Sequence, residues 1–195
     1  MFFVAFAVLM SMQCLYGCDS NTSNAECGGM NHRTINKGLL DLITKNNVTG
    51  KEYHPDGRNL AQIEAYLVQH KDAVNFDFIA RPYGFHAETT ALTLACYQAS
   101  CSEQVVQLLC DYGANPNKKG SQTCYSGTHC IHQLVDALEG NTTGVIERQR
   151  KKFTILKAAA IKNGQKLFLT ETWVVKQFRA NEDEKEFLAD TQYVN

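Results

Sequence analysis

Hydrophobic positions repeat at helical spacing along the chain, and the repeat is clearest in residues 90–117. Apolar side chains over residues 92–96 predict a short helix with one buried face. A second group, over residues 105–109, follows the i, i+1, i+3, i+4 spacing of another buried helix face. Gly113 then stands where a left-handed residue ends a helix at little cost, and the Asn-Pro-Asn of residues 115–117 favours a turn. The segment therefore predicts a helix, a short turn, a second helix and a polar loop.

A weaker copy of this pattern lies upstream. Residues 63–68 align with residues 105–110, and Asn75 then stands where Asn117 does. The offset between these two asparagines is 42 residues, which leaves a surplus in residues 76–88. We expect that surplus to project as a long loop.

A second weak copy lies downstream. Residues 130–132 align with the opening of the first helix of the pair. Residues 154–164 predict the second helix, which ends at Gly164. An insertion over residues 139–150 lengthens this copy.

Two further segments flank the copies. Residues 35–43 carry a helical stripe, which predicts an N-terminal cap helix or the first helix of a degenerate repeat. Residues 167–178 predict a C-terminal cap helix, followed by an acidic, helix-prone end over residues 181–190. Terminal repeats have to cover an outer apolar face, so atypical ends are expected.

The clearest copy resembles an ankyrin repeat. Residues 90–95, Thr-Ala-Leu-Thr-Leu-Ala, match the T-P-L-H-x-A opening of that family, residues 105–109 match its second-helix core, and residues 113–117 match its G-A-D/N-x-N ending. The resemblance implies an all-α stack of about three helix-turn-helix repeats with degenerate caps, in which neighbouring pairs bury each other's apolar faces. It also implies a non-catalytic module that binds another protein.

The N-terminus resembles the signal peptide of a bacterial lipoprotein. Residues 1–17 contain no charged side chain, and the apolar run from Phe2 to Met12 has the length of a signal-peptide core. Leu15-Tyr16-Gly17-Cys18 follows it and resembles a lipobox. In that family the peptide is cleaved before the cysteine, which then carries acyl chains. We therefore expect lipidation of Cys18 and a membrane-anchored lipoprotein on the periplasmic or surface side of the cell envelope.

These patterns divide the chain into five segments. We expect a signal peptide over residues 1–17 and a flexible tether over residues 18–33. A cap helix or degenerate repeat is expected over residues 34–57, ankyrin-like repeats over residues 58–165, and a C-terminal cap helix and tail over residues 166–195.

The composition is that of a globular chain and does not favour a nucleic-acid-binding protein. The 19 Lys and Arg residues nearly balance the 20 Asp and Glu residues, so a strongly basic surface for nucleic acid is not expected. Apolar residues make up 44% of the chain, which excludes global disorder. The sequence has no Gly-rich phosphate loop and no G-x-S-x-G or H-E-x-x-H motif. We expect no enzyme activity, no cofactor and no small-molecule substrate.

The eight cysteines fit an exported chain. Cys14 would leave with the signal peptide and Cys18 would be acylated, which leaves six. Six cysteines in an oxidising compartment permit three disulfides in any of fifteen pairings, and the sequence does not choose among them. Cys96 and Cys110 stand where Ala or Leu would also pack, and there we favour buried thiols.

Two loops are the candidate contact surfaces, over residues 75–88 and 115–125. The first is rich in aromatic side chains of the kind that anchor protein interfaces, although these rings can equally pack on the helices. The candidate partner-binding residues are Phe76, Phe78, Tyr83, Phe85, Lys118, Lys119 and Tyr125.

Three alternatives remain open. Cys124, His129, Cys130 and His132 lie within nine residues and have the side chains of a metal site or of a Cys–His enzyme, but their spacing matches no common zinc framework. The basic run over residues 147–152 is either a solvated helix face or a site for an acidic partner or lipid headgroup. Finally, the chain can be an ankyrin-type effector that acts in a host cell.

Overall fold

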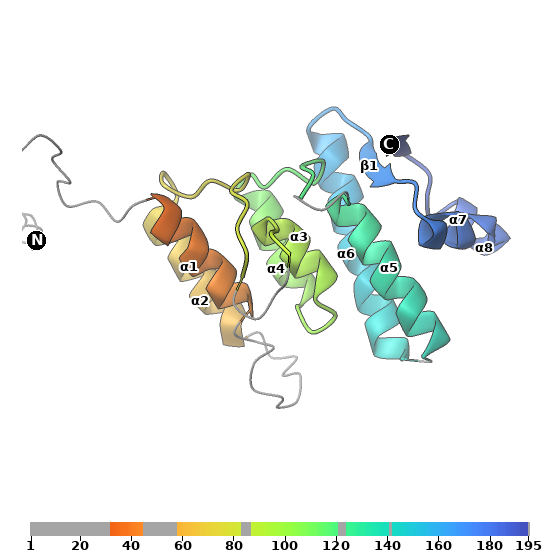
Figure 1. Cartoon of the computed structure of the whole chain (residues 1–195), viewed down its shortest axis with the longest axis horizontal. Coiled ribbons are helices and arrows are strands. Elements are labelled where there is room, and N and C mark those ends of the chain that lie inside the picture. The colour runs from red at the N-terminus through yellow and green to blue at the C-terminus, as the bar shows by residue number, and fades with distance from the viewer. Residues whose placement is uncertain (1–31, 45–57, 83–86, 121–123, 141, 195) are drawn as a thin grey trace, which may run out of the picture.

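The fold consists mainly of helices. The structure is a computed structural model that describes residues 32–44, 58–82, 87–120, 124–140 and 142–194 (Figure 1). In chain order the elements are α1 (His32–Thr44), α2 (Arg58–His70), α3 (Ala91–Tyr97), α4 (Glu103–Asp111), α5 (Ser126–Glu139), α6 (Thr143–Lys162), β1 (Leu167–Thr170), α7 (Trp173–Ala180), α8 (Glu182–Lys185) and β2 (Thr191–Val194). The helices predicted over residues 35–43, 63–68, 92–96, 105–109 and 154–164 are confirmed, and the last of them ends at Lys162, just before its Gly164 stop.

The larger helices lie in antiparallel pairs that follow one another along the molecule. Helix α1 packs on α2, α3 on α4, and α5 on α6 (Figure 1). Helices α1, α3, α5 and α7 are neighbours in that order, and we call them the inner row. Helices α2, α4 and α6 form the second row, in which α4 contacts both of the others. Each pair therefore contacts the pairs next to it in sequence.

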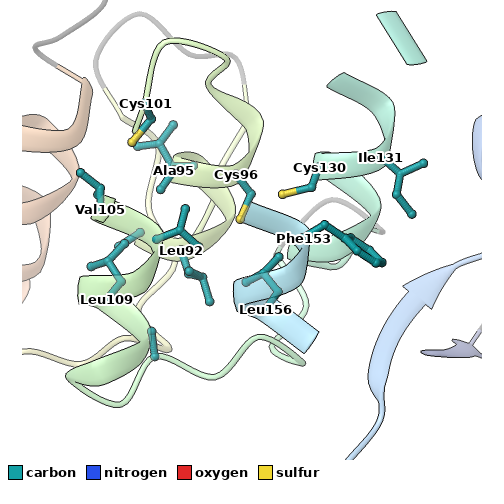
Figure 2. Packing of buried hydrophobic residues seen from close by; sticks show 14 of the residues in the cluster. Leu92, Ala95, Cys96, Cys101, Val105, Leu109, Cys130, Ile131, Phe153 and Leu156 are labelled. Atoms are coloured by element: carbon teal, nitrogen blue, oxygen red, sulfur yellow. The ribbon is translucent and has the colours of Figure 1, made fainter. Parts of the chain in front are cut away.

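One hydrophobic core runs through all the pairs. Each helix of a pair contributes side chains that are almost fully buried, and Figure 2 shows how those of α3 to α6 meet. The most buried members include Leu39, Ile43, Ile63, Leu67, Leu92, Val106, Leu109, Ile131, Phe153 and Leu156. No single pair could bury this surface alone, so neighbouring pairs stabilise one another.

The helix ends follow the expected chemistry. Thr90 is the N-cap of α3, where its Oγ1 accepts a hydrogen bond of 3.2 Å from the backbone N–H of Thr93. Gly113 and Gly164 have φ values of 100° and 71°, and each closes its helix with two backbone hydrogen bonds. One of these bonds joins residues five apart, such as Ala114 N to Leu109 O, which is the Schellman arrangement. The predicted glycine stops at both positions are confirmed.

The C-terminal region differs from the expected cap helix. Residues Leu167–Thr170 form strand β1, which pairs in parallel with β2, so the chain is mostly helical but not all-α. Leu167 and Leu169 are buried in alternation along this strand, which is a period of two rather than a helical period. Helix α7 begins only after Thr172, whose Oγ1 accepts from the N–H of Val175. The prediction of one helix over residues 167–178 is therefore wrong in its first half.

Helix α5 also begins earlier than the alignment predicts. Its first residue is Ser126, so residues 130–132 lie in its second turn and not at its opening. Gly127 lets strand β1 pack closely on this first turn, because a Cβ there would lie 2.8 Å from Cδ2 of Leu169. The predicted insertion over residues 139–150 is used mainly as helix, since α6 begins at Thr143 and is 20 residues long.

Candidate protein-binding face

The loops that connect successive helix pairs are built alike. Both the loop between α2 and α3 and the loop between α4 and α5 contain an isolated antiparallel bridge, Ala80 with Thr89 and Lys119 with Tyr125. Each loop starts with an Asn whose Oδ1 accepts the N–H two residues later, at 2.9 Å in both cases. These asparagines are Asn75 and Asn115. Asn75 therefore corresponds to Asn115, two residues before the position that sequence alignment gives.

Side chains join these loops to one another and to the next connection. Nζ of Lys118 lies 3.2 Å from Oδ2 of Asp77, which links the two loops across adjacent helix pairs. Asn117 donates from Nδ2 to the carbonyl oxygen of Lys166 at 2.8 Å, and its Oδ1 accepts from the N–H of Phe168 at 2.8 Å. The bases of three successive connections are thus bonded in series along one edge of the molecule.

The predicted aromatic anchors are only partly available at the surface. Phe76 and Phe78 are half-buried and pack against the hydrophobic core, as the alternative for these rings anticipated. Tyr83 and Phe85 lie outside the described residues. The ring of Tyr125 meets that of Phe168 edge-on, with centroids 5.8 Å apart, and Nζ of Lys119 lies 5.6 Å from the Tyr125 ring centroid. The second loop therefore carries a packed aromatic group with a cation above it.

A band of rings crosses the inner row of helices, and sequence reasoning missed it. We define the ring band as Tyr97 on α3, His129 and His132 on α5, and the hydroxyl of Thr172, the N-cap residue just before α7. The centroids of Tyr97 and His129 are 5.7 Å apart and those of the two imidazoles 6.1 Å, and both ring pairs are nearly perpendicular. Nε2 of His132 lies 3.0 Å from Oγ1 of Thr172. The polar stripe of α3, where Tyr97 follows Thr93 by four positions, is the sequence signal for this face.

The two histidines of the ring band resist protonation, because the pKa of each is lowered. Burial lowers the pKa of His129 to about 4, and the neighbouring His132 adds to the effect. Burial also lowers the pKa of His132, and the carboxylate of Asp136 opposes that shift. Tyr97 is 46% exposed and Trp173, directly after Thr172, is 71% exposed. Tyr97 is therefore the ring of the band most open to solvent, with Trp173 beside the band, whereas His129 and His132 are half-buried.

The structure separates the residues of the metal-site alternative. Cys130 is buried and its sulfur lies toward Cys96 in the core (Figure 2), whereas His129 and His132 belong to the ring band. Cys124 is half-buried before α5. Across the described ranges, no group of three or more His, Cys, Asp or Glu side chains is arranged to hold a metal ion. The geometry therefore gives this alternative no support.

Several side chains of the basic run over residues 147–152 bond to other parts of the molecule. Lys152 is fully buried, and its Nζ donates to the carbonyl oxygens of Ala95 at 2.9 Å and Gln98 at 2.8 Å. Arg148 donates to the carbonyl oxygen of Ala99, and Arg150 pairs with Glu184. The contacts of Lys152 and Arg148 satisfy carbonyl groups at the C-terminal end of α3, and that of Arg150 links α6 to α8. The run is therefore not simply the solvated face expected from its composition.

Comparison with known proteins adds no relative. No protein-family model, no curated protein and no solved structure matches the chain. Cys18, the expected lipidation site, lies outside the described residues. Within the part of the chain that the structure describes, no helix has both the length and the apolar composition needed to cross a bilayer.

Proposed function

We propose that the chain is a non-catalytic protein-binding module of ankyrin type. The proposal rests on the loops between helix pairs, which are built alike and are bonded to one another in series. The ring band of the inner row adds aromatic side chains to the same proposal. The loops and the inner helices both offer polar and aromatic side chains for contacts with a partner. Such a surface suits a protein partner better than a small molecule, which would need a deep pocket.

A repeated hydrogen bond between units supports the ankyrin assignment. Thr93 and Thr128 are each the third residue of an inner-row helix. Oγ1 of Thr93 lies 3.1 Å from Oγ of Ser126 in the next pair, and Oγ1 of Thr128 accepts from the N–H of Thr170 at 2.8 Å. Equivalent hydroxyls thus bond the second helix pair to the third and the third pair to strand β1 of the C-terminal cap. This is the behaviour expected of structural repeats that contact only their neighbours.

Site-specific photocrosslinking tests the binding face. A photoreactive phenylalanine analogue would replace Tyr97 in the full chain, and a matched control would carry it at Ile161, which is 55% exposed on α6 of the second row. Both chains would be exposed to an extract of the source cells. We expect a discrete crosslinked protein from position 97 that excess unlabelled chain competes away, and none from position 161.

Two results would overturn this assignment. Equal crosslinking from both positions would show that the inner row has no special role. A crosslinked product from position 97 that unlabelled chain does not displace would indicate unspecific contact. Charge reversal at Asp77 provides an independent check, because it breaks the ion pair with Lys118 and should weaken the competed crosslink.

We further propose that the module is exported and anchored in the cell envelope through an acylated Cys18. The support is the lipobox-like sequence described above and the polar tether that follows it. The intact mass of the native protein from a membrane fraction tests this directly. A chain that starts at Cys18 with added acyl mass is expected, and an unacylated chain that retains Met1 would contradict the proposal.

A further inference from the structure

Two buried thiols face each other between adjacent helices of the inner row. Cys96 is on α3 and Cys130 is on α5, and their exposed fractions are 0% and 1%. Figure 2 shows the sulfur of Cys130 directed toward Cys96 inside the core. The pKa of Cys96 is raised by burial and further by the neighbouring Cys130 thiol, as expected for two side chains that lie close together.

This pair stands out from the other thiols nearby. Cys101 is also buried and Cys110 is half-buried, and both lie near enough to Cys130 to interact electrostatically. The thiol toward which Cys130 points, however, is that of Cys96, and Cys101 lies farther from it (Figure 2). All of these thiols are free in the structure. Helix α3 packs directly on α5, so the two helices that carry Cys96 and Cys130 are neighbours.

We propose that Cys96 and Cys130 are a disulfide-forming pair, oxidised during folding by a small disulfide such as oxidised glutathione or by a thiol–disulfide oxidoreductase. The bond would link the second helix pair to the third through the inner row. It would close a loop that contains α4 and the connection from α4 to α5. This inference concerns the stability of the stack and does not depend on partner binding.

The chemistry proceeds by two thiol–disulfide exchanges. One cysteine thiolate attacks a sulfur of the oxidant, which forms a mixed disulfide and releases one thiol of the oxidant. The second cysteine then attacks the mixed disulfide, forms the Cys96–Cys130 bond and releases the other thiol. Two electrons pass to the oxidant, and the two protons lost by the cysteines end on its two thiols.

The reaction belongs to folding rather than to the folded protein. Burial raises the pKa of Cys96 well above that of a free thiol, so the reactive thiolate is scarce once the core has formed. A dissolved oxidant also cannot reach either sulfur through the packed helices. We therefore expect the bond to form during folding, before α3 and α5 have packed against each other and excluded the oxidant.

The test is to refold the reduced full chain with and without a glutathione redox buffer. Remaining thiols would be alkylated under denaturing conditions, and the chain would be cut with chymotrypsin. Cleavage after Tyr97 and Tyr125 separates Cys96 from Cys101 and Cys130 from Cys124. We expect a linked peptide that joins Cys96 to Cys130, and a rise in Tm of roughly 5–10 °C over the reduced chain.

Matched variants make the result specific. In Cys96→Ala, Cys130 should be alkylated, whereas Cys110→Ala should retain the linked peptide because its thiol is not part of the pair. A dominant link from Cys130 to Cys101 or Cys110, or full alkylation of both Cys96 and Cys130 after oxidative refolding, would overturn the proposal. If Cys96→Ala fails to fold, the peptide map of the unmodified chain alone decides between these outcomes.

Discussion

At the scale of single residues, the core contains buried polar groups that the hydrophobic pattern of the sequence does not predict. Lys152 is the clearest case, because its ammonium group lies among carbonyl oxygens at the end of α3. The side-chain amide of Gln149, one turn earlier on α6, is also buried and has no partner among the described residues. In sequence, Lys152 is one more basic residue in a run, and only its partners in space reveal its role.

Replacing Lys152 tests this role. Lys152→Ala would leave two carbonyl oxygens without their donor and open a cavity, so the free energy of unfolding should fall by about 3 kcal/mol. Lys151→Ala is the matched control, because Lys151 is half exposed and its ion pair with Glu147 lies at the surface. Its effect should stay within about 0.5 kcal/mol. Urea denaturation followed by circular dichroism measures both, and equal losses would refute a special role for Lys152.

The pKa of His129 makes stability depend on pH. The unfolded chain takes up a proton near the ordinary pKa of 6.5, whereas the folded chain resists protonation until about pH 4. Between these values the unfolded state binds more protons, so stability is full above pH 6.5 and is lost progressively as the pH falls toward 4. The loss should approach about 3 kcal/mol.

A variant isolates this contribution from the carboxylates that titrate in the same range. His129→Gln should show a smaller decrease in the free energy of unfolding between neutral pH and pH 4, measured by urea denaturation at each pH. An identical pH profile for the variant would mean that His129 is not responsible.

At the scale of helices and loops, the pairs could be read from the sequence because each helix has a long apolar stripe and a glycine or polar stop. The start of α5 could not, because Tyr125 is its N-cap and provides no side-chain cap. Strand β1 is four residues long, too short for its alternation to compete with the helical pattern of Trp173 to Phe178. The ring band forms only where three helices come together in space. A local sequence pattern therefore cannot predict it.

The glycine stop after α4 can be tested by substitution. Gly113→Ala places a side chain at a φ of 100° and should lower the free energy of unfolding by about 1–2 kcal/mol. Gly144→Ala, in the first turn of α6 where nothing crowds a Cβ, should be neutral or slightly stabilising. Thermal unfolding of the two variants side by side gives the answer. Equal destabilisation would show that the helix end does not require glycine.

At the scale of the whole molecule, the C-terminal strand and helices close one end of the stack. Helix α7 and strand β1 cover the outer side of α5, and Phe178 fixes α7 through ring contact with Phe187. The cap therefore replaces the neighbour that a further helix pair would provide. Its strands are the part of the fold that no repeat pattern predicts.

Two residues of α7 separate the capping role from the binding role. Phe178 is 4% exposed, and Phe178→Ala should lower the free energy of unfolding by about 3 kcal/mol. Trp173→Ala should leave stability within about 0.5 kcal/mol, since the ring is 71% exposed, but should weaken crosslinking from position 97. Denaturation and photocrosslinking of both variants test this division, and a large loss of stability in Trp173→Ala would contradict it.

The bonds that join the loops in series also fix the distance between them. Adjacent packed helices lie about 8–10 Å apart. The ion pair between Lys118 and Asp77 holds the two loops at about that spacing. A polyproline II peptide advances about 3.1 Å per residue with three residues per turn, so its side chains three positions apart lie on one face about 9 Å apart and would fall on successive loops. A partner of the proposed binding face would therefore be selected by the interval between its contacts as well as by their chemistry.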